Sequence, residues 1–305
     1  MKNKVLLLGY GFIGFSIARA LLEDVNYELF VVDRNFKIFL MKNDRITYIQ
    51  EDVFNYDNWI EQIPAGVDCL INCISNNEAV INFSYDTSDV AYGQQAISDE
   101  KALVDTLVSI SNKLKIKKTI YFSSRLTELG DNFGYGHYKN LIEQYIEEKH
   151  YPIYIFRLPM LFGVFQDISQ WPANLIWSVL NDEDMVVNDN KCSVYSWLYV
   201  ADAITVIIQQ INTLGINNNK TLTVTGMELS LGLFAALVLK LSGKMEAVNF
   251  SDTRKVNKLA CKINSLNVAE EWYEEFDERI MLAIEFIEDN IRYYENLKNS
   301  RLIKC

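Results

Sequence analysis

The sequence predicts an α/β fold: a doubly wound parallel sheet with a smaller lobe towards the C-terminus. Two observations predict it. In the first half, short apolar runs alternate with segments of helical period, as strands and crossover helices of a parallel sheet do. After Gly163 this alternation gives way to irregular, Trp-rich sequence, and two more strand-like runs follow. We therefore expect the chain to leave the sheet, build part of a second lobe and return.

The predicted strands are continuous apolar runs, because helices cover both faces of a parallel sheet. They span residues 4–8, 28–32, 46–50, 69–74, 119–123, 153–157, 195–200 and 221–225. The predicted helices span residues 13–22, 59–62, 99–113, 138–149 and 268–298, the last of them acidic and aromatic with apolar residues on one face.

Composition narrows the classes of function. The chain has 305 residues and a formal net charge of -11, which argues against a nucleic-acid partner because such binding needs clustered Lys and Arg. Two histidines are too few for a metal centre or a His-centred triad. Five cysteines without zinc or redox spacing indicate a reduced, cytoplasmic compartment. The most apolar later stretch, residues 229–241, is too short to cross a bilayer, so we expect no membrane segment.

A glycine-rich turn follows the first predicted strand. Gly9, Gly11 and Gly14 form a GxGxxG pattern directly before a helical segment. The first glycine allows a tight turn, the second lets a pyrophosphate approach the backbone, and the third lets the helix pack on the strand. Phe12 and Ile13 open that helix, whose free N–H groups attract phosphate. The pattern predicts a dinucleotide-binding site.

Two carboxylates end the next two predicted strands. Asp33 lies 19 positions past Gly14, where it can accept hydrogen bonds from an adenosine ribose, and Asp52 precedes Val53 at the end of the third strand. The plainer interpretation is that both carboxylates cap the turns that follow. Asp33 favours NAD because it repels a 2′-phosphate, whereas Arg34 could accept one, so NADP is the alternative cofactor.

A phenol and an ammonium stand four residues apart in Tyr135-Gly136-His137-Tyr138-Lys139. On a helix this spacing puts Tyr135 and Lys139 on one face, where the ammonium favours the ionised phenol and suits it to proton transfer. Ser124 ends the fifth predicted strand, so its hydroxyl lies at the same sheet edge and can hydrogen-bond a substrate oxygen. A serine that merely opens the loop is the alternative.

Together these motifs resemble the NAD-dependent epimerase/dehydratase family of extended short-chain dehydrogenases. Two later motifs add to the likeness, namely Arg157-Leu158-Pro159 leading to Phe162-Gly163, and Trp197-Leu198-Tyr199-Val200-Ala201-Asp202. The resemblance implies a Rossmann-type sheet, a small C-terminal substrate lobe and nucleotide-sugar substrates. We accordingly expect a dinucleotide-binding domain of residues 1–165 with 196–228, and a substrate-binding lobe of residues 166–195 with 229–305.

The resemblance also implies roles for particular residues. Tyr135 would be the general acid/base, Lys139 its partner, and Ser124 the contact to the substrate oxygen. Tyr135 and Lys139 would also contact the cofactor, with Lys139 binding its ribose. The cofactor would be lined by the end of the fourth strand and by the backbone after the sixth, namely Ile74, Ser75, Pro159 and Met160. Similar enzymes form homodimers through helices flanking the sheet, here residues 99–113 and 138–149.

The chain departs from the family pattern in three places. Arg125-Leu126-Thr127 follows Ser124 where sugar dehydratases resemble one another in carrying an acidic pair, which argues against dehydration. Met160 replaces an Asn that commonly contacts the sugar nucleotide. Ser98-Asp99-Glu100 replaces the usual Asn-Gly-Thr before strand five.

The leading hypothesis is an NAD(P)-dependent oxidoreductase of a nucleotide sugar, serving polysaccharide biosynthesis by 4-keto reduction or by epimerisation. Reduction is slightly favoured because the dehydration motif is missing. One alternative is a non-catalytic dinucleotide-binding sensor or assembly protein. The presence of Ser124, Tyr135 and Lys139 argues against it, because a sensor has no use for that combination. The other is an NADPH reductase of small carbonyls.

Overall fold

The computed structural model describes residues 2–38, 40–75, 90–129, 134–183, 186–187, 193–213, 221–243, 249–250 and 278–302. The chain forms two compact units, the first made of Met1–Leu158 with Ala201–Val224 and the second of Pro159–Val200 with Thr225–Cys305. It changes unit after residues 158, 200 and 224, where the sequence had predicted domain boundaries at 165, 195 and 228. Two strands account for the first and the third of these points, because the strand that ends at Leu158 and the one that ends at Thr223 belong to the large sheet.

The first unit contains a seven-stranded sheet in the order β10-β6-β5-β4-β1-β2-β3, with every neighbouring pair parallel. The strands are β1 (Asn3–Leu8), β2 (Tyr27–Asp33), β3 (Ile46–Gln50), β4 (Cys69–Asn72), β5 (Lys118–Ser124), β6 (Ile153–Leu158) and β10 (Thr221–Thr223). The strand order reverses between β1 and β4, which makes the carboxyl ends of these strands the expected place for a ligand. The predicted doubly wound α/β fold is confirmed.

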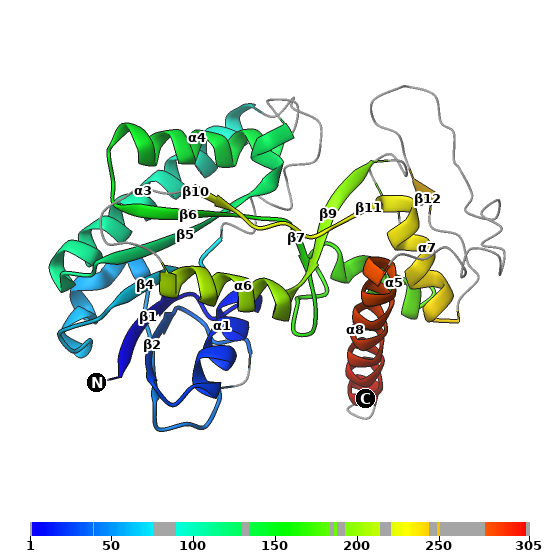
Figure 1. Cartoon of the computed structure of the whole chain (residues 1–305), viewed down its shortest axis with the longest axis horizontal. Coiled ribbons are helices and arrows are strands. Elements are labelled where there is room, and N and C mark those ends of the chain that lie inside the picture. Colours follow the sequence, from blue (N-terminus) through cyan, green and yellow to red (C-terminus); the bar gives the residue numbers. More distant parts are fainter. Residues whose placement is uncertain are drawn as a thin grey trace. The chain divides into compact units, whose positions relative to one another are not determined.

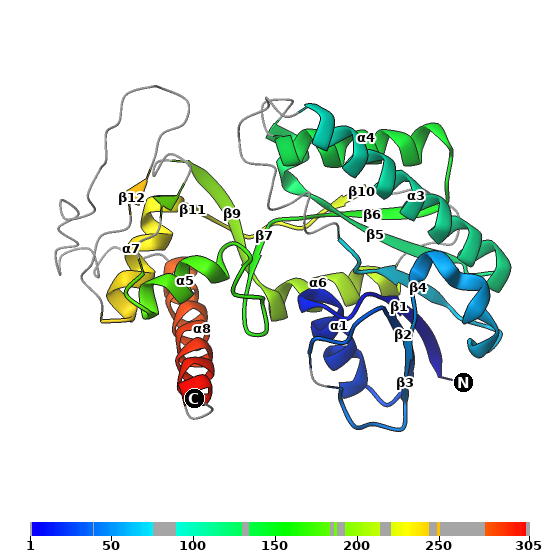
Figure 2. The same ribbon diagram turned by 180° about the vertical axis from the view of Figure 1, so that it is seen from behind.

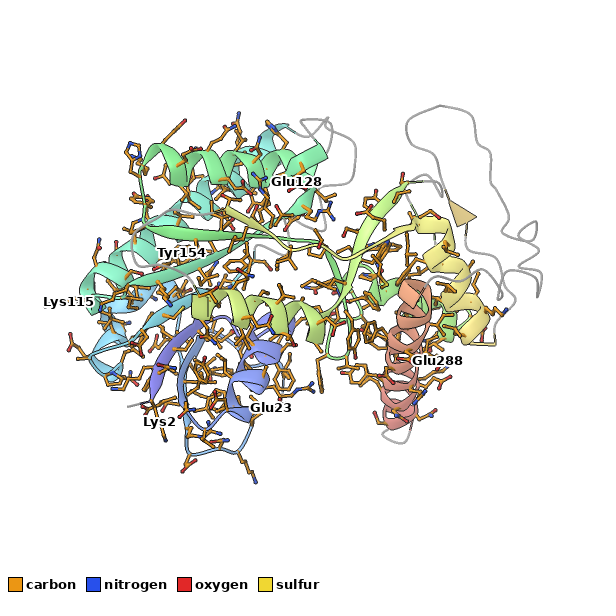
Figure 3. All side chains as sticks on the ribbon, viewed as in Figure 1. Lys2, Glu23, Lys115, Glu128, Tyr154 and Glu288 are labelled. Atoms are coloured by element: carbon orange, nitrogen blue, oxygen red, sulfur yellow. The ribbon has the colours of Figure 1, made fainter. Side chains whose placement is uncertain are left out.

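Helices cover both faces of this sheet (Figures 1 and 2). On one face lie α3 (Val90–Leu114) and α4 (Gly134–Glu148), and on the other lie α1 (Phe12–Glu23) and α6 (Val200–Thr213). Three short 3-10 helices complete the unit, namely η1 (Val53–Asn58), η2 (Ile60–Gln62) and η3 (Arg125–Leu129). Figure 3 shows Lys115, before β5, and Glu128, after it, at opposite ends of that strand.

Two helices begin earlier than the sequence pattern predicts. α3 begins at Val90 rather than at residue 99, and α4 begins at Gly134 rather than at residue 138. The first turn of α4 contains Gly134 and Gly136, which have poor helix propensity and hide the start of the helix. Tyr135 therefore lies inside the helix, so that it and Lys139 share one face of a continuous α4.

The second unit has a three-stranded sheet in the order β11-β9-β7 and a two-stranded sheet of β12 with β8. Its elements are β7 (Met160–Phe162), α5 (Ala173–Leu180), β8 (Val186–Val187), β9 (Val194–Tyr199), β11 (Met227–Ser230), α7 (Leu231–Leu241), β12 (Asn249–Phe250) and α8 (Glu278–Leu302). The fully buried Trp197 forms its core: the ring stacks on Phe234 with centroids 4.0 Å apart, and the indole N–H donates to the Leu229 carbonyl oxygen. The predicted helix 268–298 corresponds to α8, and residues 268–277 lie outside the described residues.

None of the helices in the described part of the chain is both long and apolar enough to cross a membrane.

Candidate active site

The glycine turn lies between β1 and α1 and fits tightly against β4. Gly9 has φ +93°, a conformation that L side chains rarely adopt, and a Cβ on it would meet the backbone of Cys73 and Ile74 at 2.9 Å. A Cβ on Gly14 would overlap the carbonyl oxygen of Gly9. Gly11, the N-cap residue of α1, has open space where a Cβ would stand. The geometry thus separates two structural glycines from one that leaves room for a ligand.

This separation predicts different outcomes for two matched variants. Gly14→Ala is expected to lower the free energy of unfolding by about 1–3 kcal/mol, because the overlap forces α1 off β1. Gly11→Ala, whose φ of -82° suits alanine, is expected to keep wild-type stability and to bind NAD at least about tenfold more weakly. Urea unfolding and calorimetric NAD titration of both variants measure the two effects. Wild-type NAD affinity in Gly11→Ala would show that the pyrophosphate lies elsewhere.

Both predicted carboxylates lie at the carboxyl edge of the sheet and make turn-capping hydrogen bonds. Asp33 accepts from the Tyr10 N–H at 2.5 Å and from the Asn35 N–H at 2.9 Å, so it braces the glycine turn. Asp52 accepts from the Phe54 N–H at 2.9 Å and caps η1. The guanidinium of Arg34 lies 3.8 Å from the second oxygen of Asp52 and is well exposed. Both carboxylates therefore cap the turns that follow them, which was the plainer interpretation of the sequence. Their role in binding a ribose stays a prediction.

Buried Val53 begins η1 just after Asp52. At the end of β4, the buried amide of Asn72 accepts from the Ile74 N–H and donates to the Ile74 carbonyl oxygen, each at 3.3 Å. These two bonds shape the turn that carries Ile74 and the exposed Ser75 past the sheet edge. Phe12 and Ile13 are half-buried in the first turn of α1. The residues predicted to line a cofactor in this unit therefore surround the ends of β1, β2, β3 and β4.

Lys139 is almost completely buried, with 4% of its surface exposed. Its ammonium donates to a carboxylate oxygen of Glu100 at 2.9 Å and to the Tyr121 hydroxyl at 2.8 Å. The Tyr121 hydroxyl in turn donates to the same Glu100 oxygen at 2.6 Å. The Lys139 nitrogen lies 6.0 Å from the centre of the Tyr135 ring and 5.4 Å from that of Tyr138. The predicted Tyr-Lys pair is thus adjacent, and the ammonium is already bound by a carboxylate.

These contacts shift the ionisation of the cluster. Burial raises the pKa of Tyr135 above its usual 10.0, the ammonium of Lys139 lowers it in part, and the carboxylate of Glu100 raises it again. Burial alone would raise the pKa of Glu100, but Lys139 and the hydroxyls of Tyr121 and Tyr138 outweigh it, so the net shift is downwards. Burial alone would lower the pKa of Lys139. The carboxylate of Glu100 outweighs burial, so the net shift of the Lys139 pKa is upwards. At neutral pH the cluster therefore holds a carboxylate, an ammonium and un-ionised phenols.

Ser124 lies at the end of β5 and joins the loop that packs against the start of α4. Its hydroxyl oxygen accepts from the Leu126 N–H at 3.2 Å. A Cβ on Gly136 would overlap the Leu126 carbonyl oxygen, so glycine is required for α4 to approach η3. This close approach brings the Ser124 turn next to the helix turn that holds Tyr135. Among the described residues, no hydrogen bond joins these two hydroxyls, so the role of Ser124 stays a prediction.

The neighbouring Ser123 belongs to a separate network on the face of the sheet that α4 covers. Its hydroxyl donates to Glu143 at 2.5 Å, and Arg157 binds the same carboxylate through two nitrogens. Glu128, the nearest carboxylate after Ser124, accepts from the Thr223 hydroxyl at 2.7 Å and lies 3.6 Å from Arg157. Glu128 is therefore held by structural partners, in agreement with the missing acidic pair.

Pro159 and Met160 belong to the second unit, where Met160 begins β7. The indole N–H of Trp171 donates to the Met160 sulfur at 2.9 Å. The methionine that replaces the family's usual Asn is thus fixed by an aromatic neighbour of its own unit. In the part of the chain that the structure describes, no three His, Cys, Asp or Glu side chains gather as a metal site would require.

Sequence reasoning missed two residues of the cluster. Glu100 and Tyr121 enter the sequence motifs only as a departure from the family pattern and as part of a strand. A signal existed for Glu100: the buried residues of α3 recur with helical spacing, and Glu100 falls among them. A carboxylate on an apolar helix face needs a partner, which the sequence alone does not name.

The sequence profile of one family, described as the NAD dependent epimerase/dehydratase family, matches residues 5–219. The chain belongs to this family. The match covers the glycine turn, Asp33, Asp52 and the Tyr135-Lys139 pair, so the resemblance inferred from these motifs is confirmed.

The chain is also similar, at low identity, to individual proteins and solved structures. The uncharacterized protein YtbQ of Bacillus subtilis is 24% identical over 189 residues, which span 62% of this chain and 66%, just under two thirds, of that protein. The crystal structure of UDP-glucose 4-epimerase from Thermotoga maritima is 16% identical, with a TM-score of 0.72 over 96% of this chain and 99% of that one. The dTDP-glucose 4,6-dehydratase DesIV of Streptomyces venezuelae, solved with NAD, is 14% identical, with a TM-score of 0.70 over 96% and 97%. At these identities the likeness establishes the fold.

Proposed function

We propose that this family member is an NAD(P)-dependent oxidoreductase of a nucleotide sugar, acting by 4-keto reduction or by epimerisation with Tyr135 as acid/base. The observation that carries the proposal is the pairing of Tyr135 with Lys139 on α4, in the same unit as a glycine turn with open space at Gly11. A phenol beside a buried ammonium is suited to moving a proton on a substrate oxygen. The glycine turn is suited to a dinucleotide.

The residues at the sheet edge fit an NAD molecule. The open space at Gly11 and the N-terminus of α1, with Phe12 and Ile13, would receive the pyrophosphate. Asp33 retains lone pairs for a ribose beyond the two N–H groups it binds. Its negative charge supports NAD over NADP, as does the proximity of Arg34 to Asp52. Bound there, the nicotinamide would accept or supply a hydride.

The chain's own groups would handle the proton. Tyr135 would give its proton to the oxygen of a ketone, or take one from the hydroxyl of a carbinol. Lys139 would stabilise the phenolate formed in between, and Ser124 would hold the same substrate oxygen by a hydrogen bond. Within residues 125–129, the described segment directly after Ser124, the one carboxylate is Glu128, and it is engaged by Thr223 and Arg157 rather than free to act as an additional acid for dehydration. These features support reduction or epimerisation over elimination of water.

The substrate class is supported by the structural neighbours, which include UDP-glucuronic acid 4-epimerase from Bacillus cereus solved with UDP-glucuronic acid and NAD. That enzyme is 19% identical, with a TM-score of 0.69 over 96% of this chain and 99% of its own. The second unit, by its place in the chain, would bind the sugar nucleotide. A homodimer through α3 and α4 is part of the same proposal.

A turnover panel tests the function. The purified protein is supplied with NAD, NADH, NADP or NADPH and with UDP- and dTDP-linked hexoses and 4-keto-hexoses, and nicotinamide absorbance and product NMR are followed. We expect turnover of a nucleotide-linked substrate with NAD or NADH as the better cofactor. Stoichiometric oxidation of NADH identifies a reductase, whereas product without net cofactor change identifies an epimerase. Reduction of nucleotide-free carbonyls by NADPH alone, or NAD binding without turnover of any substrate, would contradict the proposal.

A further inference from the structure

Glu100 stands out on the buried face of α3. Among the described side chains of this helix, it is the only charged one that is buried, with 2% exposed, and the others on that face are Ala96, Leu103, Val104, Leu107, Ile110 and Ser111. Burying a carboxylate is costly unless it is paired and hydrogen-bonded. Glu100 meets that condition through the ammonium of Lys139 and the hydroxyl of Tyr121.

We propose that Glu100 is a positioning residue for the proton transfer assigned to Tyr135, an inference that rests on the proposed function. Its carboxylate and the Tyr121 hydroxyl hold the Lys139 ammonium in a buried pair without net charge, and this pair leaves Tyr135 as a protonated donor in the resting site. An unpaired ammonium would favour the phenolate instead.

The electrostatics of the cluster support this assignment. From α3, the Glu100 carboxylate raises the pKa of Tyr135, while the exposed Asp99 acts on Tyr138. The groups that face the pair from β5 and from α4 are the phenols of Tyr121 and Tyr138 and the carboxylate of Glu143. Glu143 is bound by Arg157 and Ser123, which leaves Glu100 as the carboxylate that offsets the charge of Lys139 among the described residues.

The consequence is a defined protonation state of Tyr135 before substrate reacts. A protonated Tyr135 can give its proton to the oxygen of a keto group while the carbon receives a hydride from a reduced nicotinamide, and the phenolate then takes a proton from solvent. Oxidation of a carbinol needs the phenolate first, and at neutral pH the pair with Glu100 disfavours it. Glu100 thus keeps Tyr135 protonated in the resting site near neutral pH and sets how far the pH must rise before its phenolate forms.

The test is a titration of the Tyr135 phenol that needs no substrate. Tyrosinate absorbance is recorded against pH for the full-length protein, and the same curve for a Tyr135→Phe partner is subtracted in each background. In the wild type we expect the Tyr135 phenolate to form at a higher pH than that of an ordinary tyrosine, because burial and Glu100 raise its pKa. In Glu100→Gln we expect its midpoint about one to two pH units lower, because the variant removes the negative charge that raises the pKa of Tyr135 and offsets the ammonium of Lys139.

Matched variants decide the interpretation. Asp99→Asn removes a carboxylate one position away on the same helix and is expected to leave the midpoint within about 0.3 pH units of the wild type. Glu100→Asp keeps the negative charge but places it one methylene further from the ammonium of Lys139. The midpoint of the Tyr135 titration in this variant should therefore fall between those of the wild type and Glu100→Gln. A wild-type midpoint in Glu100→Gln overturns the proposal, and should that variant not fold, an unchanged midpoint in Glu100→Asp does so. Failure of the proposed function would appear separately, as turnover that survives Tyr135→Phe.

Discussion

Tyr135→Phe is expected to lower kcat by about 10²–10⁴-fold, with little change in NAD affinity or stability. The variant removes one oxygen and keeps the ring, so the tilted contact between the rings of residues 135 and 138, with centroids 6.0 Å apart, is preserved. What is lost is the proton donor that a substrate oxygen requires as it gains or loses charge. Steady-state turnover of the best substrate from the panel, together with NAD titration, measures both parts.

The matched control is Tyr145→Phe on the same helix. The hydroxyl of Tyr145 donates to Asp105 at the surface, at 2.9 Å, and we expect its removal to leave kcat within about twofold of the wild type. If the two variants retained equal turnover, Tyr135 would not be the acid/base. The proposed function would then lose the observation that carries it.

Lys139→Met is expected to destabilise the protein by about 3–5 kcal/mol at pH 7, because it leaves the buried Glu100 carboxylate without its cation. The double variant Glu100→Gln/Lys139→Met removes both charges and should recover much of this loss. Thermal and urea unfolding followed by circular dichroism compare the two variants. A double variant no more stable than Lys139→Met would show that the ion pair does not account for the loss.

The contribution of Glu100 to the stability of the fold depends on pH with opposite signs in the wild type and in Lys139→Met. In the wild type the folded pKa of Glu100 is lowered, so its contribution to stability is present above the unfolded pKa and is lost as the pH falls through the folded value. In Lys139→Met the carboxylate keeps its burial without the ammonium, which raises its folded pKa above the unfolded one. The deficit of this variant should therefore shrink as the pH is lowered from 8 to 5, while the Glu100 contribution in the wild type stays constant over that range.

The order of elements followed from local pattern alone. Apolar runs located all eight predicted strands to within two residues at either end. The central strands β1, β4 and β6 read most plainly, because a strand covered on both faces is apolar almost throughout. Helix starts were less well predicted: α3 begins nine residues early and α4 four, since glycine and polar residues mask the period where a helix begins. The return of the chain to the large sheet at β10 also followed from pattern. The pairing of β7, β9 and β11 into a sheet of their own did not.

For the site, the sequence by itself determined the glycine turn, the carboxylates after β2 and β3, and the Tyr135-Lys139 pair, because each lies within one turn or one helix. Only the tertiary structure decided which groups bind the ammonium of Lys139. They are Glu100, 39 residues before it in the chain, and Tyr121, 18 residues before it. It also decided that Asp52 and Glu128 are engaged by neighbours. The physical reason is that sequence spacing fixes neighbours along one element, whereas the partner of a buried charge is set by the packing of α3, α4 and β5.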